Sequence, residues 1–325
     1  MKHHFGDELD RSGGHWTITP NRERWAHHYS SILEAPADVS VLTLTRHTAE
    51  WKRALTFERL TELTLHEPSR EQLAAIPDFR SLKVLRLTHA RPKSLAMLCA
   101  QQNLREIVFE YVSGTADLSP LGELPNLTAL HVENMRNISD FSILARAAAL
   151  RYLSLDGTPD WKQPVESFGF LGDMQTLEYL RLRNIRPPKD TNPLLALRRS
   201  QGIKKLDISM DVFSLEIFAW LEAALPGVEG AARVPFKKYG GEDRELHPRD
   251  IRSRMPLEQF SAYKDLYTTA DGKRFERIPH QALLLGKGER HVSGRPEVVD
   301  ERCEAHAERY RKLVEAAKLD LIKAQ

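Results

Sequence analysis

The stretch that decides the fold is DLSPLGELPNLTALHVENMRNISDFSILARAAALRYLSLDGT, residues 117–158. It contains the pattern L-x-x-L-x-L twice, with conservative apolar replacements, beginning at Leu127 and again at Leu150. Before each copy runs a segment whose apolar residues are three apart, as at Leu118, Leu121 and Leu124. Such spacing is typical of a helical turn. Strand-like and helix-like pieces therefore alternate within one repeating unit.

The same pattern recurs on both sides of this stretch. Eight copies begin at Val39, Leu60, Leu82, Leu104, Leu127, Leu150, Leu177 and Ile203. Successive copies start 21 to 27 residues apart, and repeats of about 20–29 residues stack into solenoids. In each copy the L-x-L core is expected to form a strand that turns its apolar side chains inward and the intervening side chains outward. The sequence predicts an α/β solenoid with a parallel sheet on its concave face.

The quoted stretch resembles the 22-residue type of leucine-rich repeat found in bacterial internalin-like and protein-phosphatase-regulator-like proteins. The resemblance covers residues 39–208, a little over half of the chain. It implies a curved solenoid and, by analogy of fold, a role in protein binding. One feature departs from those families, which place asparagine three residues after the last strand leucine. That position here holds Pro68, Ala90, Val112, Met135, Thr158 and Ile185.

The ends of a solenoid expose apolar residues and need caps. We expect residues 1–38 to form a helical N-terminal cap and residues 39–235 to form the repeats with a terminal helix. Residues 236–325 are expected to form a small α+β capping unit, with a hairpin at Asp271-Gly272 and a helix from about Glu297 to Ile322. Deleting residues 297–325 should then lower the melting temperature of the repeats.

Composition excludes several classes of protein. Hydrophobic residues make up 41% of the 325 residues and charged residues 28%, as in soluble globular proteins. A net charge of +2 gives no reason to expect nucleic acid. The chain has two cysteines, no apolar stretch near its N-terminus and none long enough for a membrane span. We therefore expect a cytoplasmic protein that binds neither nucleic acid nor membrane. The resemblance to bacterial repeats implies a bacterial protein, and we expect it to be a monomer.

No set of residues predicts an active site. Gly286-Lys287-Gly288 lacks the spacing and the Ser or Thr of a phosphate loop and favours a hairpin turn. Cys303 and His306 fall on one apolar stripe of the last predicted helix, and the further ligands of a structural zinc site are missing. We predict no enzymatic activity, no metal and no cofactor.

The concave face is the predicted binding surface. Its middle is acidic with tyrosines nearby, and arginines follow toward the C-terminal side. The candidate residues are Glu106, Glu110, Tyr111, His131, Glu133, Tyr152, Asp156, Tyr179, Arg181 and Arg183. Clustered acids and aromatic anchors suit a protein partner, and a basic one in particular. Reversing Glu110 and Glu133 to Lys is expected to slow association with little effect on folding.

These observations favour a non-enzymatic protein-binding scaffold that uses the concave face. A bacterial inhibitor or immunity-type protein is one form of that role. The alternatives are an effector that acts on a host protein and an enzyme whose site lies in the C-terminal unit.

Overall fold

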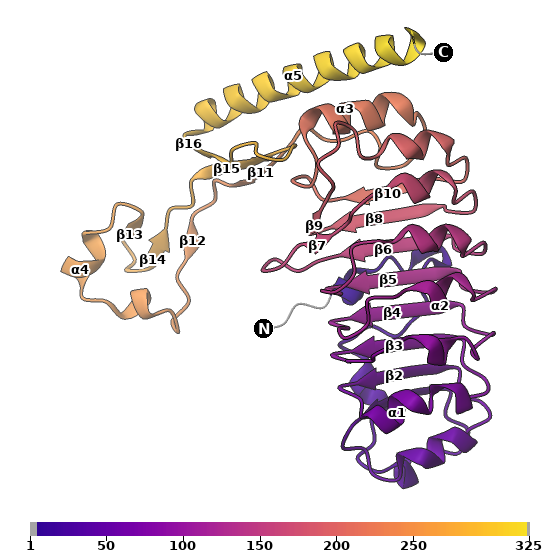
Figure 1. Ribbon diagram of the computed structural model, residues 1–325. Helices are drawn as coiled ribbons and strands as arrows, with labels where there is room; N and C mark the ends of the chain where they lie inside the picture. The colour runs from indigo at the N-terminus through magenta and orange to yellow at the C-terminus, as the bar shows by residue number, and fades with distance from the viewer. Residues whose placement is uncertain (1–4, 324–325) are drawn as a thin grey trace. The chain divides into compact units, whose positions relative to one another are not determined.

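The computed structural model describes residues 5–323, which form two compact units (Figure 1). The first contains the described residues up to Val212 together with Leu225–Ala231, and the second contains Phe213–Ala224 and the residues from Ala232 onward. Among the described residues, no helix is both long and apolar enough to cross a membrane.

The first unit is built on an eight-stranded parallel sheet. Its strands, in spatial order, are β1 (Val41–Thr45), β2 (Glu62–His66), β3 (Val84–Thr88), β4 (Glu106–Glu110), β5 (Ala129–Glu133), β6 (Tyr152–Asp156), β8 (Tyr179–Arg183) and β10 (Lys205–Ile208). Each strand contains one of the eight predicted L-x-L cores, and equivalent positions pair across the sheet, as Leu85 does with Ile107. The inward leucines have no exposed surface, as at Leu130 and Leu180. The predicted solenoid with a parallel sheet is confirmed.

Short helical segments return the chain from one strand to the next. They are η5 (Trp51–Thr56), α1 (Arg70–Ala74), η6 (Ile76–Asp78), η7 (Ala96–Leu98), α2 (Ser119–Gly122), η8 (Ser142–Arg146), η9 (Gly169–Gly172) and η10 (Leu195–Arg199). Most are single 3₁₀ turns, because a repeat of this length leaves few residues after its strand. Their apolar side chains, such as Leu121 and Leu144, complete the core beneath the sheet. The longer repeats add a two-stranded parallel pair, β7 (Gln163–Pro164) and β9 (Ile185–Arg186).

Glutamines satisfy backbone groups near the turns of several repeats. Residues at the asparagine position, such as Val112 and Met135, are apolar and buried. The side chain of Gln163 accepts a hydrogen bond from the Met135 amide (2.9 Å) and donates one to the Ile138 carbonyl (2.7 Å). Gln101 donates to the Phe79 carbonyl (2.8 Å) in an earlier repeat. Backbone groups that would otherwise be buried without partners are thereby satisfied.

The N-terminal residues do not all lie at the end of the sheet, where the sequence analysis placed the whole of residues 1–38. The elements there are η1 (Phe5–Glu8), η2 (Ser12–Gly14), η3 (Arg24–His27) and η4 (Ile32–Glu34). His28 and Ser31 bridge to Thr43 and Ala49, next to the first strand. Residues 6–21, which we call the N-terminal segment, instead lie across the other face of the sheet from the return helices (Figure 1).

The second unit combines two small antiparallel sheets with helices. One sheet has the order β11 (Phe236–Gly240), β15 (His280–Leu284), β16 (Val292–Gly294), and the other β12 (Arg244–Glu245), β14 (Arg274–Glu276), β13 (Leu266–Thr268). The helical elements are α3 (Leu215–Ala224), η11 (Ile251–Arg254), α4 (Leu257–Ser261) and α5 (Pro296–Lys323). Helix α3, which the sequence analysis grouped with the repeats, packs on α5. Cys303 and His306 lie on the buried side of α5, and His306 Nε2 is 3.0 Å from the Leu285 carbonyl oxygen.

Candidate functional site

All ten predicted binding residues lie on or beside the concave face, the sheet surface that faces away from the return helices. Nine are on β4, β5, β6 and β8, and Tyr111 directly follows β4. Strand register arranges the face in three rows across the sheet. The middle row contains Arg86, Val108, His131, Ser154 and Arg181. The row toward the carboxyl ends of the strands contains Glu110, Glu133, Asp156 and Arg183.

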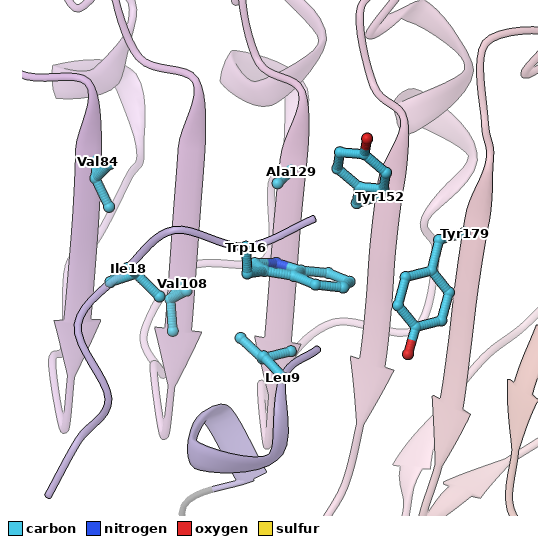
Figure 2. Close-up of a cluster of buried hydrophobic side chains, with 8 residues drawn as sticks. All are labelled: Leu9, Trp16, Ile18, Val84, Val108, Ala129, Tyr152 and Tyr179. Atoms are coloured by element: carbon cyan, nitrogen blue, oxygen red, sulfur yellow. The ribbon is translucent and has the colours of Figure 1, made fainter. Parts of the chain in front are cut away.

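The N-terminal segment covers this face with apolar side chains. Leu9, Trp16 and Ile18 pack against strand residues from two of these rows (Figure 2). Val84, Ala129, Tyr152 and Tyr179 belong to the row toward the amino ends of the strands, and Val108 belongs to the middle row. The indole of Trp16 has no exposed surface, and its ring centroid lies 5.3 Å from that of Tyr179. The middle of the concave face is therefore buried in the protein core and is not a surface open to a partner.

Polar side chains of the face bind the backbone of the same segment. The Glu106 carboxylate accepts hydrogen bonds from the amides of Thr17 (2.8 Å) and Ile18 (3.2 Å), and Glu62 accepts one from the Thr19 amide (2.9 Å). Farther along the sheet, Arg181 donates to the Glu8 carbonyl (2.8 Å). Burial raises the pKa of Glu106, and the hydrogen bonds it accepts from Thr17 and Ile18 partly oppose that rise. These contacts provide hydrogen-bond partners for backbone groups of the segment that would otherwise be covered without one.

Burial changes what the predicted residues offer to a partner. Eight of the ten are buried, namely Glu106, Glu110, His131, Glu133, Tyr152, Asp156, Tyr179 and Arg181, whereas Tyr111 and Arg183 are partly exposed. The acids that suggested a basic partner thus present no negative surface. Glu110 and Glu133 are each 0% exposed. Reversing them to Lys would bury unpaired charge, so we now expect those substitutions to destabilise the fold rather than to leave it intact.

A cluster of ionisable groups lies beneath the segment. Arg181 Nη2 is 3.2 Å from Asp156 Oδ2, yet burial outweighs the arginine and raises the pKa of Asp156 to about 7. Burial likewise lowers the pKa of His131 to about 3, so its imidazole is neutral at pH 7. Among the described residues, the guanidinium nitrogens of Arg86 make no hydrogen bond, and Arg86 Nε lies 3.9 Å from Glu110 Oε2. The cluster is polar, and its side chains have no exposed surface.

Three side chains in this cluster are of metal-ligating types. Glu110, His131 and Glu133 each place one ligand atom within 4.8 Å of the others. The sequence predicted no metal site, because no complete set of metal ligands occurs at short fixed spacings along the chain. Glu110 and Glu133 are 23 residues apart in the chain but are direct neighbours across β4 and β5. Aligning the repeats by their strand register, and then noting the residue types at paired positions, would have predicted that these two glutamates are neighbours.

An open groove runs along the carboxyl ends of the strands, beside the covered face. We call it the strand-end groove. It has a volume of about 890 Å³, and its lining includes Arg46, Glu67, His89, Arg91, Tyr111, Arg136 and Asp160. The rings of His89 and Tyr111 stack with centroids 4.8 Å apart. Arg91 and Arg136 are exposed, and Arg136 also lies over the Trp161 ring, 5.8 Å from its centroid. The groove therefore combines aromatic surface with the exposed charges of Arg91, Arg136 and Asp160.

Eight parallel strands in unbroken register, each followed by a short helical return, decide the fold. The chain is a leucine-rich-repeat protein. No family model matches the sequence, and no curated protein matches it either.

Solved structures with leucine-rich repeats are similar to this chain. An internalin from Listeria monocytogenes, inlF, is 16% identical with a TM-score of 0.37, and the match covers 50% of this chain and 53% of the internalin. Internalin C2 from the same organism is 21% identical with a TM-score of 0.37, covering 53% and 70%. A leucine-rich-repeat protein from Leptospira interrogans is 16% identical with a TM-score of 0.33, covering 59% and 57%. The chain thus spans about half the length of the first of these proteins. At such identities the likeness concerns the fold alone.

Proposed function

We propose that this leucine-rich-repeat protein is a non-enzymatic scaffold that binds another protein through the strand-end groove. The observation that carries the proposal is that the groove is open, whereas the middle of the concave face is filled by the N-terminal segment. Leucine-rich repeats typically bind proteins with surfaces formed by successive repeats. The groove is such a surface, because its lining residues come from the turns that follow β1 to β6.

Apart from an ion pair between Arg46 and Glu67, the groove has two exposed arginines, Arg91 and Arg136, against one exposed carboxylate, Asp160. This balance suits an acidic segment of the partner. Arg46 is engaged by Glu67, with 3.7 Å between Nη2 and Oε2. Arg91 and Arg136 are exposed and lie in the turns that follow β3 and β5. A planar guanidinium binds carboxylates in two-point contacts, and aromatic surface nearby strengthens such contacts. A partner that presents Asp or Glu beside an aromatic or aliphatic residue would match this lining.

An inhibitor or immunity-type role is the specific form of binding that we favour. An inhibitor needs a surface that covers its target and no chemical group of its own. The lining of the groove provides arginines and aromatic rings rather than a nucleophile paired with a base. An effector that binds a host protein would use the groove in the same way, and the identity of the captured partner distinguishes the two.

The test compares two charge reversals in the full chain. Arg91→Glu with Arg136→Glu reverses the groove, and Lys83→Glu with Arg105→Glu makes the same change in charge at exposed positions preceding β3 and β4. Tagged protein would capture partners, and mass spectrometry would quantify each one for wild type and both variants. We expect a partner whose capture falls at least about tenfold with the groove variant and is unchanged with the control. If every captured protein binds the groove variant as well as wild type, the groove is not the binding surface.

A further inference from the structure

The repeat register places two carboxylates and one imidazole at a single point of the sheet. Glu110 on β4 and Glu133 on β5 are direct partners in the parallel pairing. His131 precedes Glu133 by two residues, so both side chains lie on the concave face. All three side chains have no exposed surface.

The distances within this trio are close to those of a metal site. His131 Nε2 lies 3.6 Å from Glu133 Oε2, and all three ligand atoms lie within 4.8 Å of one another. Two ligands held about 2.1 Å from a tetrahedral ion are roughly 3.4 Å apart. The separations of the three ligand atoms, at most 4.8 Å, exceed that spacing by no more than about 1.4 Å.

The imidazole supplies an independent indication of a ligand. His131 Nδ1 is hydrogen-bonded to Ser154 Oγ at 2.8 Å, whereas the buried Nε2 atom has no hydrogen-bond partner among residues 5–323. A hydrogen bond at one ring nitrogen is the usual way in which proteins orient the other nitrogen toward a metal. Neutral imidazole is the form that binds metals. The Nε2 atom of His131 lies 3.6 Å from Glu133 Oε2. A cation between these two atoms would attract both the imidazole lone pair and the carboxylate oxygen.

We propose that Glu110, His131 and Glu133 bind one divalent first-row transition-metal ion beneath the N-terminal segment. Imidazole together with carboxylates is a ligand set suited to Zn²⁺ and to its neighbours in the series. Asn21 Nδ2 donates a 2.6 Å hydrogen bond to Glu110 Oε1, so a residue of the N-terminal segment directly contacts one ligand. Metal binding is therefore coupled to closure of that segment over the face.

The experiment uses the full chain, stripped with a chelator and then titrated with Zn²⁺. Calorimetry and elemental analysis after gel filtration should show one tightly bound equivalent for wild type. His131→Gln should weaken that binding at least about tenfold. His47→Gln, a matched change at an exposed histidine, should not weaken it. Cys303→Ala should also retain the equivalent.

Amide exchange on wild type gives a readout that needs no variant. Added Zn²⁺ should slow exchange in residues 16–21 more than in the return helices, because the bound ion favours the closed segment. Absence of a tight equivalent from wild type would overturn the proposal. So would an equivalent that survives His131→Gln or is lost with Cys303→Ala. Neither result bears on the strand-end groove, whose test depends on partner capture.

Discussion

Trp16 is the largest apolar side chain that the N-terminal segment buries, and its indole lies against Tyr152 and Tyr179 with no exposed surface. We predict that Trp16→Ala lowers the free energy of unfolding by about 3–5 kcal/mol, through lost burial and the cavity left behind. Trp25→Ala is the matched control, since Trp25 is 45% exposed, and should cost less than about 1 kcal/mol. Urea denaturation measures both. Equal effects of the two substitutions would mean that Trp16 is not buried on the sheet.

Asp10 fixes the same segment near the other end of the sheet. Partial burial tends to raise its pKa, but hydrogen bonds from Ser12 and from the Lys205 ammonium (3.0 Å) outweigh burial and lower the pKa to about 2. A carboxyl whose pKa is lower in the folded state than in the unfolded state stabilises the fold above the unfolded value of 3.8, and this contribution is lost as pH falls toward 2.

We therefore predict that Asp10→Asn destabilises the protein at pH 7 by about 1 kcal/mol, allowing for solvent screening at this partly exposed site. The difference from wild type should shrink steadily as the pH falls from 4 toward 2. Denaturation curves across that range are the measurement. A difference that does not depend on pH would show that the carboxylate charge plays no part.

The strands could be predicted from sequence, whereas the covering of the concave face could not. Each L-x-L core is a local pattern of the sequence. It occurs eight times, and the eight resulting strands pair in one sheet. The N-terminal segment has no such period. Its contacts join residues far apart in the chain, as in the hydrogen bond between Thr17 and Glu106 across 89 residues. The repeat register predicts which residues lie on the concave face. It does not predict whether they are exposed, because that depends on the N-terminal segment, whose position no sequence pattern indicates.

The role of the glutamines near the turns also could not be predicted from sequence, because each one binds backbone groups of another repeat. Gln163 satisfies the Met135 amide and the Ile138 carbonyl. We predict that Gln163→Leu costs about 2–4 kcal/mol, because both backbone groups would be left buried without partners. Gln102→Leu, at an exposed glutamine that donates only to the Cys99 carbonyl, should change stability by less than about 0.5 kcal/mol. Thermal denaturation of the two variants would contradict this account if it ranked them in the opposite order.

At the scale of the whole molecule, the chain passes from the first unit to the second and back. Helix α3 belongs by its contacts to the second unit, although the residues on both sides of it, up to Val212 and from Leu225, belong to the first. Within the second unit, α5 packs on α3, and Tyr310 donates a 2.6 Å hydrogen bond to Glu222. Val299 and Cys303 of α5 also complete a core with Ala282 and Val292.

We predict that deleting residues 297–325 exposes that core, promotes aggregation and lowers the melting temperature of the repeats, to which α3 is joined at both ends. Calorimetry of the truncated and full-length chains is the comparison. If the truncated chain melts like the full-length protein and stays monomeric, the second unit does not support the repeats.

Coverage of the concave face by the N-terminal segment is the central claim, and amide hydrogen exchange at Thr17, Ile18 and Thr19 tests it most directly. These amides donate to Glu106 and Glu62 in the structure, at 2.8, 3.2 and 2.9 Å. We predict that these three amides exchange slowly, with protection approaching that of the β4 amides. Exchange at these three positions as fast as in an unstructured peptide, with the strands still protected, would contradict it.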